Sequence, residues 1–197
     1  PWFEKLSSQF EAVWWVPGNH EFYHGSIDPE NTSWQKEICP NVFLVYNHSL
    51  IYKGIHLIFS PLWSHLSERN AWYIQQSVSD FHVINTNKGK LLPVDFNQLH
   101  RNCLSYIEKC LQESLGEKTV VVTHHVPTLQ QYPEKYKGDI LNEAFAVDLD
   151  DLILQNNIES WIFGHHHDNT GSFKIDGTTM LTNQLGYVKY GENKCFE

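Results

Sequence analysis

Three short apolar runs along the chain have the length and composition of buried β-strands. They cover residues 12–16, 119–123 and 158–163. The first is an uninterrupted apolar run that stops at Pro17-Gly18, which is typical of a strand buried on both faces. A polar segment follows each run directly. The pattern therefore predicts a sheet whose strand ends carry polar loops.

Helical periodicity is clearest over residues 95–115, where apolar side chains recur on one stripe and Gly116 marks the stop. Residues 1–11 have the pattern of a helix end, and weaker patterns predict helices over residues 29–38 and 147–155. Helices and buried strands alternate in the second half of the chain, as they do in βαβ units. This order predicts an α/β protein.

Residues 42–45 are predicted to form a further strand, and two hairpins are expected because turn-forming pairs separate short strand-like runs. These hairpins join residues 49–52 to 56–60 through Lys53-Gly54, and residues 170–175 to 178–182 through Asp176-Gly177. By contrast, residues 61–93 show no clean period and mix aromatic with charged side chains. That segment is interpreted as a cap or an excursion over the surface.

Composition narrows the class of protein. The 197 residues suffice for a single domain, and a hydrophobic fraction of 41% excludes a disordered chain. No apolar run approaches the roughly 18 residues of a membrane helix. The formal net charge of −9 argues against general nucleic-acid binding, which needs clustered Lys and Arg. Any anionic ligand therefore requires a local positive centre.

The cysteines indicate a reducing compartment. Cys39, Cys103, Cys110 and Cys195 form no Cys-x-x-Cys pair, and Cys103 and Cys110 are two helical turns apart, roughly 10 Å, too far for a disulfide. We interpret all four as reduced thiols of a cytoplasmic protein. A structural zinc module is disfavoured because no cysteine lies near the histidines.

Histidines gather where the three buried runs end. Six of the twelve histidines lie in segments that follow these runs, namely His20, His124, His125, His165, His166 and His167. The carboxyl ends of strands in open α/β sheets form the crevice in which ligands bind, so these segments are expected to converge. In an extended segment His165 and His167 would share a face while His166 points away. Imidazole is a common ligand of Zn, Fe and Mn, so a metal site is favoured over an exposed histidine run without a ligand.

Three motifs in this order resemble the calcineurin-like metallophosphoesterase family: Gly18-Asn19-His20-Glu21, Thr123-His124-His125 and Gly164-His165-His166-His167. Segments 61–81, 132–145 and 183–197 look like a bacterial-type branch of uncharacterised phosphoesterases. The resemblance implies a four-layer α/β/β/α sandwich with two mixed β-sheets. It covers the whole chain as one domain.

Carried over to this chain, the resemblance implies that Asn19, His124 and His165 bind one metal and His167 the other. His20 would be the catalytic histidine, and a hydroxide bridging two divalent ions would attack the phosphorus of a small phosphate mono- or diester. Neutral imidazoles and an amide oxygen suit Mn, Fe or Zn better than Mg. Two such ions neutralise phosphoryl charge without a Lys or Arg cluster.

The chain departs from the family pattern at one point. The family's Asp-x-His and Gly-Asp-x-x-Asp motifs precede Gly-Asn-His, and residues 1–17 leave no room for them. Two look-alikes, residues 80–82 and 138–142, come too late and are interpreted as chance matches, the first on the surface and the second in a turn. We therefore expect a truncated enzyme, lacking Met at its start, that is inactive as these residues alone. A catalytically inactive binding scaffold of the same fold is the alternative.

Other residues admit two interpretations each. Tyr132, Lys137 and Asn142 could contact substrate or be solvated loop residues, and Asp168 could orient a ligating imidazole. Trp14 and Trp15 are expected in the core. Four aromatic and histidine side chains of the 61–93 segment could cap the crevice or simply pack, namely Trp63, His65, Trp72 and Tyr73.

Overall fold

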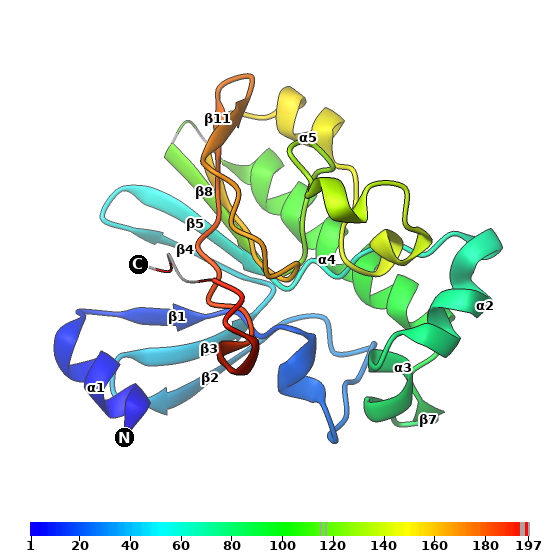
Figure 1. Cartoon of the computed structure of the whole chain (residues 1–197). Helices are drawn as coiled ribbons and strands as arrows, with labels where there is room; N and C mark the ends of the chain where they lie inside the picture. Colours follow the sequence, from blue (N-terminus) through cyan, green and yellow to red (C-terminus); the bar gives the residue numbers. More distant parts are fainter. Residues whose placement is uncertain (115, 117, 194–195, 197) are drawn as a thin grey trace.

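A mixed six-stranded sheet forms the larger half of the computed structural model, which describes residues 1–114, 116, 118–193 and 196 (Figure 1). Its strand order is β10-β11-β9-β8-β5-β4. The strands are β4 (His48–Tyr52), β5 (Ile55–Ser60), β8 (Lys118–Thr123), β9 (Ile158–Ile162), β10 (Phe173–Ile175) and β11 (Thr178–Leu181). Strands β5, β8, β9 and β11 run parallel, whereas β4 and β10 are antiparallel edge strands. The carboxyl ends of the parallel strands therefore meet at one edge.

A second mixed sheet has the order β1-β3-β2, with β1 (Val13–Trp15) parallel and β2 (Trp34–Cys39) antiparallel to β3 (Val42–Tyr46). A short ribbon pairs β6 (Asn85–Thr86) with β7 (Gly89–Lys90). The predicted α/β class with two mixed sheets is confirmed. The β4–β5 hairpin turns as expected, since Lys53 and Gly54 both have positive φ, at 50° and 78°.

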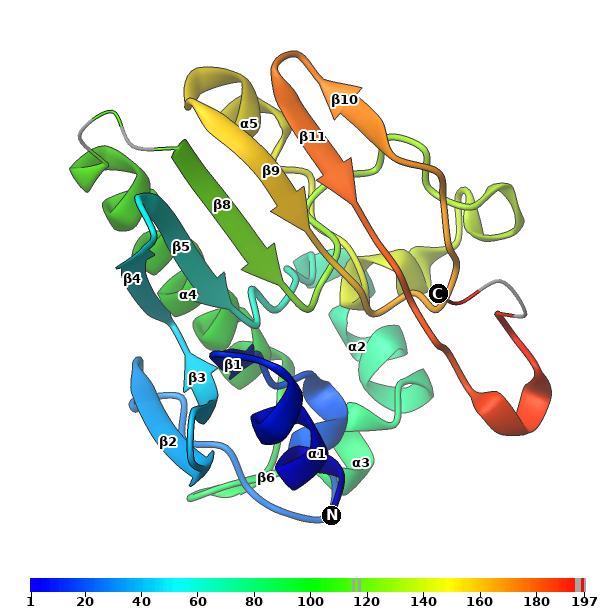
Figure 2. The same ribbon diagram turned by 90° about the vertical axis from the view of Figure 1, so that its left-hand side faces the viewer.

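Helices α4 (Pro93–Glu113) and α5 (Asp150–Gln155) cover one face of the six-stranded sheet, behind it in Figure 2. Their apolar stripes and the sheet form a first hydrophobic cluster that includes Val121, Trp161 and Ile153. The predicted helix over 95–115 corresponds to α4, although residue 115 lies outside the described part of the chain. No helix among the described residues is both long and apolar enough to cross a bilayer.

Residues 61–93 contribute both to the interior and to the surface. They contain α2 (Glu68–Ser77) and α3 (Asp80–Val83), and they supply much of a second hydrophobic cluster. Trp63 is completely buried there and donates its indole N–H to the hydroxyl of Tyr46 at 3.2 Å. Trp72, by contrast, is 72% exposed. The sequence of this segment lacks a regular hydrophobic period because its helices and strands are short and each buries only a few side chains.

The helix predicted over 29–38 is wrong, because this segment forms the strand β2. It pairs with β3 in antiparallel register, with Trp34 opposite Tyr46, and the two rings stack at 5.5 Å. Cross-strand pairing overrides the local helical pattern here. The predicted burial of β1 on both faces is also wrong, since its three residues are only partly buried.

A groove of about 410 Å³ separates β1 from the six-stranded sheet. Trp14 and Trp15 line it from one side, and Val122 and Ile162 line it from the other. Trp14 still contributes to packing, because its ring stacks on Phe59 at 5.9 Å. The two sheets are thus in contact at one end and separated along β8 and β9.

We expect Trp63→Ala to lower the free energy of unfolding by about 3–5 kcal/mol, because it empties a fully buried site and removes the indole N–H that donates to the Tyr46 hydroxyl. Trp72→Ala should change it by no more than about 0.5 kcal/mol, as is usual for exposed positions. Urea denaturation followed by circular dichroism measures both. A loss below about 1 kcal/mol for Trp63→Ala would contradict its assignment to the core.

Candidate metal centre

Three donor atoms from three segments converge beyond the carboxyl edge of the large sheet. Asn19 begins the short 3₁₀ helix η1 (Asn19–Phe22), His124 follows β8, and His165 follows β9. The distance from His124 Nε2 to Asn19 Oδ1 is 3.2 Å, and that to His165 Nδ1 is 2.9 Å. The sequence expectation that these segments converge agrees with this placement.

The local backbone explains the convergence. The amide of Gly164 donates to the carbonyl of His124 at 3.0 Å, which holds the loops after β8 and β9 together. His165 and His167 both have positive φ, at 77° and 58°, an uncommon conformation for these residues. The segment is therefore not extended, and its three histidines point in different directions. On the first loop, the Gly18 amide donates to Glu21 Oε2 at 2.6 Å and fixes the start of η1.

Gly18 leaves room for the imidazole of His124. A Cβ added at position 18 would lie 2.4 Å from His124 Cε1 and 2.7 Å from both ring nitrogens. Its φ of −88° is ordinary, so the requirement for glycine is steric and not conformational. The first motif thus packs directly against the second.

The buried imidazoles are uncharged at neutral pH. Burial lowers the pKa of His124 to about 3, assisted by repulsion from His20 and His167. Burial and the neighbouring His125 and His124 likewise place the pKa of His165 well below its usual value. Neutral imidazoles keep a lone pair free, which is the form that binds metal ions.

The other histidines of these motifs have separate partners. His125 bonds the Pro61 carbonyl through Nδ1 and packs against the ring of Trp63. His166 accepts from Gln184 Nε2 at 2.9 Å. His167 Nδ1 lies 3.1 Å from Glu192 Oε2, and its ring meets that of Tyr187 edge-on. His167 Nδ1 is thus engaged by Glu192, while its ring is near enough to His124 and His165 to disfavour their charged forms.

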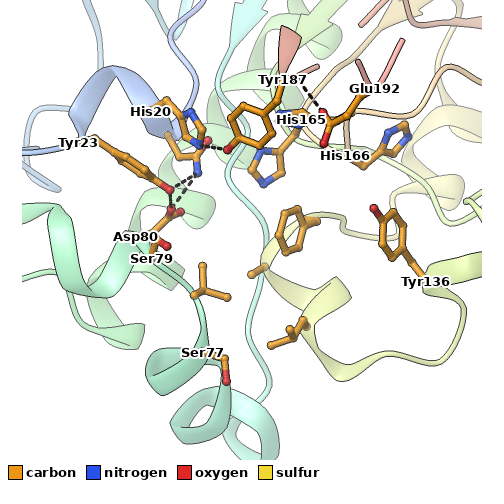
Figure 3. Close-up of a pocket in the computed structure, with 16 residues that line it drawn as sticks. His20, Tyr23, Ser77, Ser79, Asp80, Tyr136, His165, His166, Tyr187 and Glu192 are labelled. Carbon is orange, nitrogen blue, oxygen red and sulfur yellow. Dashed lines mark hydrogen bonds and ion pairs between the residues drawn. The ribbon is translucent and has the colours of Figure 1, made fainter. Parts of the chain in front are cut away.

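His20 is exposed on η1 and stands between two tyrosines (Figure 3). Its ring centroid lies 4.4 Å from that of Tyr23 and 6.0 Å from that of Tyr187. The Tyr187 hydroxyl is 3.4 Å from His20 Nε2. Tyr187 belongs to the segment after β11, whose contribution to this site had no signal in the sequence.

A cavity of about 340 Å³ includes Asn19, His20, His165 and His167 in its lining. Among the described residues that line it there is no Lys or Arg, whereas Asp80 and Glu192 are both present. A phosphate in this cavity would face two carboxyl groups and no Lys or Arg among the described lining residues. A bound metal ion would supply the positive charge that it needs.

The three substrate-binding candidates are placed differently from one another. Tyr132 and Asn142 line an adjoining cavity of about 170 Å³, together with His166. Lys137 is outside the described lining of both cavities and pairs with Glu134.

Asp168, expected to orient an imidazole through its side chain, instead binds Lys135 at 2.6 Å. Only its backbone amide reaches a histidine, donating to His166 Nδ1 at 3.1 Å.

Asp80 belongs to the look-alike motif that the sequence analysis interpreted as a chance match on the surface. It is 1% exposed, and its Oδ1 accepts from Asn19 Nδ2 at 2.8 Å and from the Tyr23 hydroxyl at 2.7 Å. Burial raises the pKa of Asp80, although these two hydrogen bonds oppose the shift. The assignment of residues 80–82 to the surface is therefore wrong for Asp80. Gly138 does lie in a turn, with φ at 79°.

The donor set fits one ion in part. Ligands around a tetrahedral Zn²⁺ with bonds of about 2.0–2.1 Å lie roughly 3.3 Å apart, close to the observed spacing. Within the described residues, no three His, Cys, Asp or Glu side chains gather around one point. Two imidazoles and the amide oxygen of Asn19 thus form an incomplete set that leaves positions open.

The family model described as calcineurin-like phosphoesterase matches residues 1–169. The chain belongs to the calcineurin-like phosphoesterase family. An uncharacterised protein of Acanthamoeba polyphaga mimivirus is 35% identical over 204 residues, covering 94% of this chain and 71% of that protein. This match extends the likeness over almost the whole chain.

A solved structure supports the fold of this phosphoesterase. The phosphopantetheinyl hydrolase of Mycobacterium tuberculosis superposes with a TM-score of 0.66 over 98% of this chain and 76% of its own, at 16% identity. The likeness confirms the metallophosphatase fold. Family membership supports a phosphoesterase-type function, and it implies divalent metal cofactors.

We expect Gly18→Ala to weaken Zn²⁺ binding by about tenfold or more, because the new methyl group displaces the His124 ring. Isothermal titration of the metal-free phosphoesterase with Zn²⁺ alone measures the affinity. Gly171→Ala is the matched control, since a Cβ there meets nothing within 4 Å. Equal affinities for the two variants would show that His124 does not bind the ion.

Proposed function

We propose that this phosphoesterase hydrolyses a small phosphate mono- or diester in a metal-dependent reaction. The observation that carries the proposal is the convergence of Asn19, His124 and His165 beside a cavity whose described lining has no Lys or Arg. Bound cations would supply the positive charge that attracts a phosphate ester to such a site. Family membership supports the same class of reaction.

Asn19, His124 and His165 would hold one divalent ion, and His167 would contribute to a second. Mn, Fe or Zn suits nitrogen ligands better than Mg. Two such ions supply positive charge to the phosphoryl oxygens and activate the attacking water. The residues themselves contribute neutral, desolvated donors, which need not lose a proton before they bind an ion.

His20 is the proposed catalytic histidine. Its imidazole lines the cavity, yet its hydrogen-bond neighbour is the Tyr187 hydroxyl and none of the three donor atoms. The ring is therefore able to give a proton to the leaving oxygen while the metal ligands stay in place. Tyr187 and Tyr23 confine the ring from two sides.

The adjoining cavity is the proposed site for the leaving group. Tyr132 and Asn142 line it, and it shares Tyr136, Phe145 and His166 with the larger cavity. Its lining is mainly aromatic, which suits a group with apolar surface. Lys137 is given no role here, because Glu134 already neutralises it.

A binding scaffold without catalysis is the second candidate. The incomplete donor set favours it, because no three His, Cys, Asp or Glu side chains of the described residues gather around one point. For either function we propose a cytoplasmic location. Cys39, Cys103 and Cys110 are free thiols, as a reducing compartment requires, while Cys195 lies outside the described residues.

We expect the 197-residue chain to bind one equivalent of Zn²⁺ or Mn²⁺ tightly and a second one weakly. The first ion has three converging donors, whereas the second has His167, whose Nδ1 already contacts Glu192. Elemental analysis after dialysis counts the ions. Two equivalents retained per chain would contradict this assignment.

We expect His165→Ala to abolish both metal binding and turnover, and His20→Ala to abolish turnover while metal affinity stays within about threefold. Turnover is measured with p-nitrophenyl phosphate and bis-p-nitrophenyl phosphate on the protein expressed from its complete reading frame. His56→Ala is the control, because this imidazole bonds Ser114, away from the site.

Metal-dependent turnover that survives His165→Ala would refute the site. Stoichiometric metal binding with no turnover of either ester would favour the scaffold. Turnover by the 197 residues alone would contradict the expectation that they are inactive.

A further inference from the structure

The buried Asp80 side chain accepts a hydrogen bond from the Asn19 amide at the proposed metal site. Asn19 carries an oxygen that can bind a metal ion and an NH₂ group that cannot. A half-turn of the amide exchanges these two atoms at almost no steric cost. Something must therefore select the productive orientation.

Asp80 supplies that selection through hydrogen-bond polarity. Asp80 Oδ1 acts as a hydrogen-bond acceptor, so the atom of Asn19 that faces it must be the donor nitrogen. Asn19 Nδ2 lies 2.8 Å from Asp80 Oδ1, which leaves Oδ1 of Asn19 on the opposite side, 3.2 Å from His124 Nε2. A flipped amide would place oxygen against oxygen at one end and NH₂ among the metal donors at the other.

Tyr23 strengthens this arrangement. Its hydroxyl donates to the same Asp80 oxygen at 2.7 Å and lies 3.5 Å from Asn19 Nδ2 (Figure 3). The shared acceptor is thus approached by two donors, and Asp80 is fixed by both. Because Asn19 and Asp80 are each at most 5% exposed, water does not compete for these bonds.

We propose that Asp80 is a positioning residue, which holds the Asn19 amide oxygen toward His124 and His165 so that it can bind the metal ion. This inference rests on the proposed metal site and adds to it the residue that orients one ligand. Asp80 does not bind the ion itself in this proposal, because the Asn19 amide lies between the two.

A double-mutant cycle tests the proposal. Zn²⁺ alone is titrated into the metal-free 197-residue chain, into Asn19→Ala, into Asp80→Leu and into the double variant. We expect each single substitution to weaken binding by about tenfold and the double variant to be no weaker than Asn19→Ala. Additive losses would overturn the proposal, since Asp80 would then act independently of Asn19. Unchanged affinity in Asp80→Leu would overturn it as well.

Conservative variants separate orientation from folding. Asp80→Asn keeps an acceptor oxygen, so it should lose less Zn²⁺ affinity than Asp80→Leu. Tyr23→Phe should also lose less Zn²⁺ affinity than Asp80→Leu, because the hydrogen bond from Asn19 to Asp80 remains. Asp95→Asn is the stability control, since Asp95 caps α4 through the Leu92 amide. If Asp80→Leu does not fold, Asp80→Asn in the Asn19→Ala background completes the cycle. A further loss there would overturn the proposal.

Failure of this proposal can be distinguished from failure of the proposed function. If the unmodified chain binds no Zn²⁺, or if His165→Ala binds it normally, the metal site itself is refuted. If the unmodified chain binds Zn²⁺ through His165 and Asp80→Leu binds equally well, only the role of Asp80 is refuted.

Discussion

Parallel pairing of β8 with β9 is the constraint on which the site depends. Val121 lies opposite Trp161 and Val122 opposite Ile162, so the two strands end together and their following loops begin side by side. His124 and His165, 41 positions apart in the chain, meet for this reason. A slip of one residue would turn every side chain of a strand to the opposite face and separate them. The register of these strands, whose residues Val121 and Trp161 are buried in the core, therefore also sets the donor geometry.

Burial at this edge of the sheet keeps the imidazoles of His124 and His165 in the neutral form that can bind a metal ion. The chain carries a formal net charge of −9, and the described cavity lining adds carboxyl groups and no Lys or Arg. Desolvation keeps His124 and His165 neutral, so the protein offers donors without offering positive charge. An ion that binds there would add positive charge to a lining without Lys or Arg. In the proposed function, metal binding would therefore also supply the charge that a phosphate ligand needs.

Sequence patterns predicted the elements whose signal is local. The apolar runs located β1, β8 and β9, and the turn pairs located both hairpins. The strand β2 was mistaken for a helix because its identity depends on pairing with β3, which no window of the sequence contains. Asp80 was set aside as part of a chance match for a similar reason, since it lies 61 positions from Asn19 and its contact with Asn19 is not local in the sequence. The directions of His165 and His167 also depend on positive φ values that a His-x-His spacing does not reveal.

The donor atoms lie across the seam between the two hydrophobic clusters. His124 and His165 extend from strands of the first cluster, whereas Asn19 shares η1 with Phe22, which packs against the second. Asp80 adjoins Phe81, a member of that same second cluster. An ion held by residues from both clusters would link the two halves of the core, because it would bind only when both are assembled. By mass action it would then make them unfold together, so occupancy of the site would control the cooperativity of the whole domain.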